Sequence, residues 1–147
     1  MIRRVLLLGG ALSFSLVGAF SVAHAATLTV TTLQDEDGEN LTSCSLREAI
    51  KASGTKLAYG GCKAGQLNFT DTIQLAAGTY TLTRGELVIN GNMEILGSYV
   101  PDPFSINPFT GTSPSTPAIT TIIVAASGSR IFNSSVSGDQ LNLSNMI

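Results

Sequence analysis

Histidine is almost absent from the 147-residue sequence, and its scarcity excludes several kinds of site. The single histidine, His24, lies within the expected export signal, so the exported chain has none. A Ser-His-Asp or Cys-His nucleophile system therefore cannot be built in that chain. A zinc site with a histidine ligand is excluded too, and two cysteines alone cannot complete a structural zinc site.

The export signal is predicted over residues 1–25. Two arginines precede an uncharged, mainly apolar run over 5–22, and Ala23-His24-Ala25 supplies the small-x-small cleavage pattern, with Ala26 as the first mature residue. The alternative is an uncleaved membrane anchor. The run is barely long enough to span a bilayer, however, and glycines and serines dilute it.

Basic residues are also scarce. Of the eight in the sequence, Arg3 and Arg4 leave with the signal, so residues 26–147 keep six beside ten acidic residues, a formal net charge of −4. Scattered Lys and Arg on an acidic chain give no electrostatic footprint for nucleic acid. No second segment is apolar enough to span a membrane. We therefore expect one exported domain, secreted, periplasmic or cell-surface, with no nucleic-acid partner and no membrane span after signal cleavage.

The only two cysteines are Cys44 and Cys62. Export leads to oxidising compartments, so a disulfide between them is the natural expectation. The bridge would close a loop of about 19 residues, a stabilisation of roughly 3 kcal/mol in the chain-entropy model. A pair of free thiols is the alternative. A reactive redox pair is disfavoured because the spacing is not Cys-x-x-Cys.

A short helix is predicted directly after the first cysteine. Ser45 and Glu48 stand at the spacing of a capping box, in which each side chain accepts a hydrogen bond from the other residue's backbone amide. Gly54 is placed to end the helix in a left-handed turn. For Arg47 and Glu48, a solvated or capping role is favoured over a catalytic one.

This helix cannot stand alone, because about two turns are too few to be stable in water. Its apolar face, which includes Leu46 and Ile50, must therefore dock on another part of the chain. The rest of the chain supplies short β-type pieces separated by Gly- and Asn-containing turns. The expected strands lie at 27–31, 72–75, 79–82, 86–89, 93–96, 119–124, 130–132 and 141–143.

Two architectures accept many short strands: an antiparallel sandwich or barrel, and a parallel β-helix, in which short strands of successive coils stack. The spacing favours the parallel β-helix. Ile73 to Ile95 spans 22 residues and Ile122 to Leu143 spans 21, close to one coil each. The interval from Ile95 to Ile122 is 27 residues and includes every proline, which suggests a loop inserted at 98–117.

The predicted interior of these coils consists of the apolar residues at alternating strand positions. They are Ile73, Leu75, Tyr80, Leu82, Leu87, Ile89, Ile95, Ile122, Val124, Ile131, Phe132, Leu141 and Leu143. A β-helix exposes apolar side chains and strand edges at its ends. We therefore expect Leu46 and Ile50 to plug the first coil, held in place by the Cys44–Cys62 bridge.

The stretch "TLTVTTLQDEDGENLTSCSLREAI" closely resembles the CSLREA domain, whose name is spelled here by residues 44–49, and "TIQLAAGTYTLTRGELVINGNMEILG" resembles the first coil of that family. The resemblance covers the mature chain apart from the Pro-rich insert. It implies a right-handed parallel β-helix of the pectin-lyase type that opens just after a signal peptide. It also implies a secreted or surface-attached bacterial protein, and it carries over no catalytic residues.

The chain is thus divided into a signal peptide, 1–25; a strand, capping helix and cysteine loop, 26–66; and the first coils of a β-helix, 67–147, with the inserted loop at 98–117. The expected fold is mainly β, with a short N-terminal capping α-helix. The ending "DQLNLSNMI" stops on an apolar strand without a polar or helical cap. We therefore expect the chain to be the beginning of a longer protein, with downstream coils as its partner.

An acidic loop precedes the first cysteine. Asp35, Asp37 and Glu39 stand at alternate positions around a glycine, as in loops that bind calcium. The later bidentate Glu of an EF-hand is missing, and an acidic turn between strand and helix is the alternative. We expect no cofactor, with these three carboxylates as the calcium candidates.

Two functions are compatible with the sequence. The first is a non-enzymatic one: an end-capping region of an exported β-helix that displays a surface for adhesion or for binding carbohydrate or another surface ligand. The second is part of a polysaccharide lyase or hydrolase, because the fold hosts such enzymes. Those enzymes need a carboxylate cluster or pair, whereas the charged residues after the cysteine loop are scattered singly: Arg84, Glu86, Glu94, Arg130 and Asp139. The first function is therefore favoured.

Overall fold

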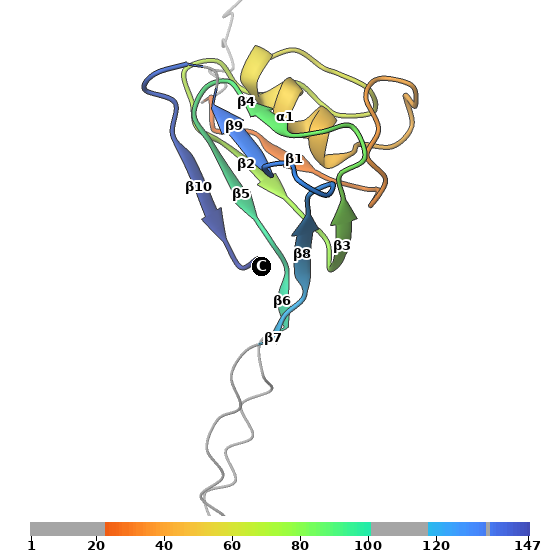
Figure 1. Ribbon diagram of the computed structural model, residues 1–147. Helices are drawn as coiled ribbons and strands as arrows, with labels where there is room; N and C mark the ends of the chain where they lie inside the picture. The colour runs from red at the N-terminus through yellow and green to blue at the C-terminus, as the bar shows by residue number, and fades with distance from the viewer. Residues whose placement is uncertain (1–22, 101–117, 135) are drawn as a thin grey trace, which may run out of the picture.

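The computed structural model describes residues 23–100, 118–134 and 136–147. Most of the predicted signal peptide, 1–22, and most of the predicted insert, 101–117, lie outside these ranges. The described part is mainly β, with short strands and one helix (Figure 1). In chain order the elements are β1 Thr27–Thr29, α1 Leu46–Thr55, β2 Asp71–Gln74, β3 Gly78–Thr81, β4 Leu87–Ile89, β5 Met93–Leu96, β6 Tyr99–Val100, β7 Ala118–Ile119, β8 Thr121–Val124, β9 Phe132–Ser134 and β10 Leu141–Ser144.

The strands pair in parallel, apart from one short antiparallel pair. The largest sheet has the order β1-β2-β5-β10, and two further parallel pairs join β3 to β8 and β4 to β9. In the large sheet Ile73 is the register partner of Ile95, as their spacing predicts. Figure 1 shows β10, β5, β2 and β1 side by side, with α1 close to β4 and β1.

The chain visits the three sets of paired strands in one repeating order. It passes through β2, β3 and β4, then through their partners β5, β8 and β9, and returns to the large sheet as β10. After β10 the backbone runs on beside β8: the Ile147 amide donates to the Thr121 carbonyl, and the Ile123 amide donates to the Ile147 carbonyl, each at 3.0 Å. Consecutive segments thus lie against each other in the same sequence of strands.

The predicted interior is correct through β5. Its first seven residues, from Ile73 to Ile95, are all buried, and Ile131, Phe132 and Leu141 are half-buried against the same core. The prediction for β8 is wrong. Ile122 and Val124 are 38% and 41% exposed, whereas their neighbours Thr121 and Ile123 are buried. The prediction for Leu143 in β10 is wrong too, since that side chain is 47% exposed.

The register predicted for Ile122 is also wrong. Its partner is Thr79 in β3, so it does not follow Ile95 by one coil, and Leu143 pairs with Ile95 itself. The outward direction of Ile122 has its own physical reason in Thr121, which points inward because its hydroxyl donates to the Ala76 carbonyl at 3.2 Å. A strand that shifts by one residue exchanges its two faces, so this buried threonine turns Ile122 outward.

The predicted insert lies between β5 and β8. The short strands β6 and β7 pair antiparallel, with Tyr99 opposite Ile119 and Val100 opposite Ala118. They flank residues 101–117, so the chain leaves the parallel strands and returns to them at one place. Within the described ranges, no helix has the length and apolar character needed to cross a membrane.

Candidate functional site

The N-terminal end of α1 is built as the sequence predicts. The Ser45 hydroxyl accepts from the Glu48 amide at 3.3 Å, and the Glu48 carboxylate accepts from the Ser45 amide at 2.9 Å, so the capping box is confirmed. Glu48 is fully buried, and its second oxygen accepts from the Gly38 amide at 2.8 Å. The cap residue therefore also ties the helix to the acidic loop.

The C-terminal end of α1 differs from the prediction. Gly54 lies inside the helix, which runs to Thr55 and ends with Lys56 in the left-handed conformation at φ 58°. Gly54 is needed for another reason. A side chain at that position would collide with the carbonyl oxygen of Asn90, in the turn between β4 and β5. The missing side chain thus allows α1 to lie close against the strands.

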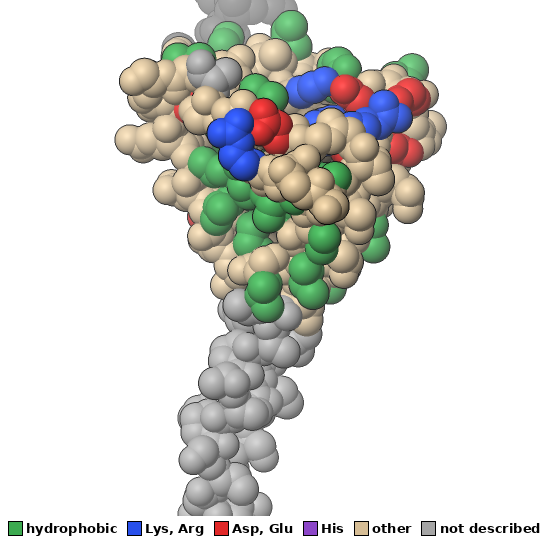
Figure 2. Space-filling view, in the orientation of Figure 1, with side chains coloured by type: hydrophobic (Ala, Val, Ile, Leu, Met, Phe, Trp, Pro, Cys, Tyr) green, Lys and Arg blue, Asp and Glu red, His purple; other side chains and the backbone are tan. Residues whose placement is uncertain are grey.

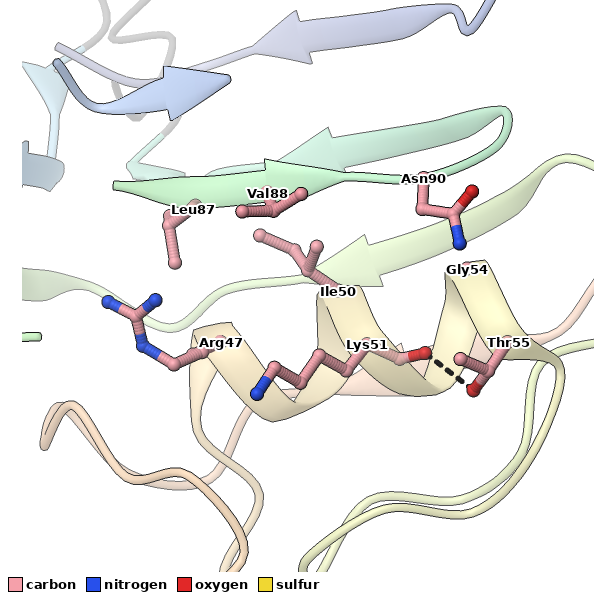
Figure 3. A pocket seen from close by; sticks show the side chains of 8 residues that line it. All are labelled: Arg47, Ile50, Lys51, Gly54, Thr55, Leu87, Val88 and Asn90. Atoms are coloured by element: carbon pink, nitrogen blue, oxygen red, sulfur yellow. Dashed lines mark hydrogen bonds between the residues drawn. The ribbon is translucent and has the colours of Figure 1, made fainter. Parts of the chain in front are cut away.

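The apolar face of α1 packs on the strands. Leu46 and Ile50 are 3% and 2% exposed, and the helix contacts β1, β2, β4 and β5. In Figure 3, Ile50 points toward Leu87 and Val88 of β4. The groove along this seam is lined by Arg47, Ile50, Lys51, Gly54, Thr55, Leu87, Val88 and Asn90.

The predicted disulfide between Cys44 and Cys62 is confirmed. Both cysteines are buried, and Cys44 is bound to the extension of β1 on both sides of its backbone: its amide donates to the Thr31 hydroxyl at 2.9 Å, and its carbonyl accepts from the Thr31 amide at 2.8 Å. The bridge thus attaches the start of α1 to β1 and to the turn that contains Cys62.

A buried ion pair that the sequence did not reveal joins α1 to the acidic loop. Arg47 binds Asp35 with two hydrogen bonds, from Nε at 2.7 Å and from a terminal nitrogen at 3.0 Å. The two side chains are only 8% and 2% exposed. Arg47 also donates to the carbonyls of Gly85 and Glu86, each at 2.9 Å. The expectation of a solvated Arg47 is therefore wrong, because protein acceptors take the place of water around its guanidinium group.

The Asp35 carboxylate serves a third segment as well. It accepts from the backbone amides of Thr83 at 2.7 Å and Arg84 at 2.9 Å, in the turn between β3 and β4. Burial alone would raise the pKa of Asp35, but the hydrogen bonds from Arg47 and from these two amides outweigh it and hold the pKa below its ordinary value. One ionised carboxylate thus connects the loop, the helix and the β3–β4 turn.

The three calcium candidates are bound to basic side chains. Asp35 pairs with Arg47, Asp37 with Lys51, and Glu39 with Arg84. Asp37 also accepts from the Tyr59 hydroxyl at 3.0 Å. The carboxylates therefore face three different cations rather than one common point. In the described part of the chain, no group of three or more His, Cys, Asp or Glu side chains could hold a metal ion.

The charged residues that follow the cysteine loop are partly brought together. Arg130 donates to Glu86 at 3.1 Å across the β4–β9 pair, and Asn133 donates to the other oxygen of Glu86 at 2.7 Å. Glu94 accepts from the Thr72 hydroxyl at 3.5 Å. Neither interaction places two carboxylates together, as a glycosidase mechanism requires.

The site that the structure does build is the contact of residues 35–62 with the strands. Helix, disulfide and buried ion pair hold residues 35–62 against β1, the β3–β4 turn and β4. Scans against protein-family models, curated proteins and solved structures found no match for this chain.

Proposed function

We propose that this chain forms the N-terminal cap and the first coils of a right-handed parallel β-helix in an exported bacterial protein, as its resemblance to the CSLREA domain implies. Residues 71–92 would form the first coil, residues 93–140 with their insert the second, and β10 would begin the third. The proposal is supported by the three parallel strand sets that the chain visits in a fixed order, which is the pairing expected of stacked coils.

A row of register partners in the large sheet carries the capping part of the proposal. Leu28, Ile73, Ile95 and Leu143 lie one behind another on β1, β2, β5 and β10. Their exposed fractions are 2%, 0%, 0% and 47%. Leu28 and Leu143 both lie on edge strands, yet only Leu28 is covered. Since α1 contacts β1, the row is closed at the helix end and open at the β10 end.

An open end of stacked strands needs a partner, because apolar side chains and unpaired backbone groups there promote association. Downstream coils of a longer chain are the partner that fits β10 and β8, since they would continue the same parallel pairing. The cap would then serve to close the first coil and start the stack, and the long flank of the stack would serve for adhesion or for binding carbohydrate or another surface ligand.

Self-association of the exported, processed chain tests the open end. We expect concentration-dependent association by size-exclusion chromatography with light scattering, and Leu143→Lys should abolish it by placing a charge on the exposed edge. Leu57→Lys is the matched control, because Leu57 is 68% exposed and lies just after α1. A parent chain that stays monomeric at all concentrations, or a control that acts like Leu143→Lys, would contradict the proposal.

We further infer that the chain has no lyase or hydrolase activity of its own. The inference is supported by the interactions of Glu86 and Glu94, which bind basic or polar side chains and not a second carboxylate. Purified protein should release no unsaturated or reducing ends from pectic and other acidic polysaccharides, with or without calcium. Release that copurifies with the protein would favour the enzymatic alternative.

A further inference from the structure

The first residue of the predicted mature chain, Ala26, is hydrogen-bonded to a buried carboxylate. The backbone nitrogen of Ala26 donates to an oxygen of Asp71 at 3.0 Å. Asp71 begins β2 and is 0% exposed. The contact follows from the register, because Thr27 pairs with Thr72 and the residues just before them therefore lie opposite each other.

Asp71 is fully surrounded by donors from other segments. The oxygen that binds Ala26 also accepts from the Gln66 amide at 3.0 Å, and the second oxygen accepts from the Ser53 hydroxyl at 3.2 Å and the Lys56 ammonium at 2.6 Å. Burial alone would raise the pKa of Asp71, but the bonds from Lys56, Gln66 and Ala26 outweigh it and keep the pKa below its ordinary value. The group facing Ala26 is therefore a carboxylate with a full negative charge at neutral pH.

The peptide bond before Ala26 is accessible. Residues 23–25 are exposed and belong to no helix or strand, whereas Ala26 is half-buried and Leu28 is buried. Cleavage is predicted from the sequence at this same bond. Ala26 is thus where an exposed leader meets the folded domain.

We propose that signal cleavage creates a charged anchor: the new α-ammonium group of Ala26 forms a buried ion pair with Asp71 and fastens β1 to β2. Water hydrolyses the Ala25–Ala26 bond. The C–N bond breaks, the hydroxyl of the water goes to the Ala25 carbonyl carbon and its other hydrogen goes to the Ala26 nitrogen. The freed amine then takes up a proton, which balances the proton that the new Ala25 carboxyl group releases. No movement of the backbone is required, because the nitrogen already lies within hydrogen-bonding distance of Asp71.

The charge makes the processed chain different from its precursor. In the precursor the Ala26 nitrogen is a neutral amide with one hydrogen, but after cleavage it carries a positive charge in contact with a carboxylate that water does not reach. Charge-assisted hydrogen bonds are roughly twice as strong as neutral ones. The other charged groups near this point are Lys56, on the opposite oxygen of Asp71, and Glu94 on β5, which is bound to Thr72.

The α-amine of the processed protein tests the proposal. The full chain is exported from a bacterial host, its first residue is identified by mass spectrometry, and the pH dependence of acylation of the α-amine is measured in the folded protein. We expect the amine to hold its proton about tenfold more tightly than an exposed α-amine, whose pKa is about 8. The extra stability should be full below that ordinary value and should disappear as the pH rises through the raised pKa.

A glycine inserted between Ala25 and Ala26 is the matched control. It keeps the neutral hydrogen bond from the Ala26 amide and moves only the charge, so the amine should titrate normally and the melting temperature should fall by a few degrees. Asp71→Asn should also return the amine to its ordinary pKa, and the glycine comparison stands even if that variant does not fold. The proposal would be overturned if the first residue is not Ala26 or if its amine has an ordinary pKa. It would also be overturned if the pKa of the amine and the melting temperature are the same with and without the inserted glycine.

Discussion

The two edge strands of the large sheet, β1 and β10, lie in opposite surroundings although they belong to the same row of register partners. On β1, Leu28 is buried beneath α1, whereas on β10 the equivalent Leu143 is nearly half exposed. Figure 2 shows a related contrast on one face, where charged side chains gather near the helix end and hydrophobic side chains lie over the strands below.

The contrast shows how residues 35–62 cover the β1 edge with buried charged side chains as well as apolar ones. Besides Leu46 and Ile50, this cover contains Glu48, Arg47 and Asp35, all of them buried or nearly so. Burying charges is costly unless each is paired and hydrogen-bonded. Here Arg47 has Asp35 and two carbonyls, and Asp35 has two backbone amides besides Arg47. Glu48 has no basic partner, but its two oxygens accept from the backbone amides of Ser45 and Gly38. The cover is therefore specific in position, because a shifted helix would leave those charges unpaired.

The largest expected difference in stability is between two single variants, in which one or the other of the two equivalent leucines is replaced by aspartate. Leu28→Asp would bury an unpaired charge and remove a packed side chain, a loss of at least about 4 kcal/mol, so little folded protein should accumulate. Leu143→Asp should cost about 1 kcal/mol or less, because that side chain is already exposed. Soluble yield and urea unfolding measure both variants. Equal losses would mean that the two edges are not different.

Removing the buried arginine should have the next largest effect. Arg47→Met leaves the Asp35 carboxylate without its cation and should cost about 3–5 kcal/mol. Arg130→Met is the control, because Arg130 also pairs with a carboxylate but is 73% exposed, and such pairs contribute about 0–1 kcal/mol. Urea unfolding at neutral pH compares them. If both variants lose the same free energy of unfolding, the Arg47–Asp35 ion pair does not fix residues 35–62 against the strands.

Breaking the disulfide should have the third largest effect on stability. Cys44→Ser should cost about 3 kcal/mol, the value expected when two residues 18 positions apart are no longer linked. Cys62→Ser should match it, and the double variant should lose no more than either single one. Before reduction, mass spectrometry should find no thiol that can be alkylated. Two such thiols in the exported protein would contradict the bridge.

The smallest expected effect is the response to acid. The pKa values of Asp35 and Asp71 lie below the ordinary value of 3.8, so both carboxylates stabilise the fold above about pH 4 and lose that contribution as the pH falls through their lowered pKa values. The melting temperature should therefore fall by about 5 °C or more between pH 5 and a pH below these lowered pKa values. A melting temperature that stays constant over the same range would show that these carboxylates are not bound as described.

Local patterns were enough to predict the parts of the cap that depend on neighbouring residues. The capping box needs only Ser45 and Glu48 at the right spacing, and the disulfide was predicted from two cysteines in a chain expected to be exported. The 22-residue step from Ile73 to Ile95 was readable because a polar residue, Thr72 or Glu94, precedes each isoleucine and marks the outer face of its strand. These features all depend on short-range chemistry or on a clean alternation.

The parts that were missed depend on contacts distant in sequence. In β8, Ile122 and Ile123 are both apolar, so alternation could not select the inner face, and the choice is made by the hydrogen bond from Thr121 to Ala76. Asp35 and Arg47 gave no sign of meeting, because their other partners come from a later turn, which supplies two amides to Asp35 and two carbonyls to Arg47. Lys56 replaces Gly54 as the left-handed residue, since Gly54 is needed against Asn90.

Hydrogen exchange of the two edge strands tests the central claim most directly. The claim is that the helix end of the strand array is closed and the β10 end is open. Native-state exchange, followed by mass spectrometry of peptides that contain β1 and β10, reports the opening of each strand separately. The account predicts that the amides of β1 exchange much more slowly than those of β10, and that Arg47→Met reduces the difference. Equal exchange in the two strands, or faster exchange in β1, would contradict it.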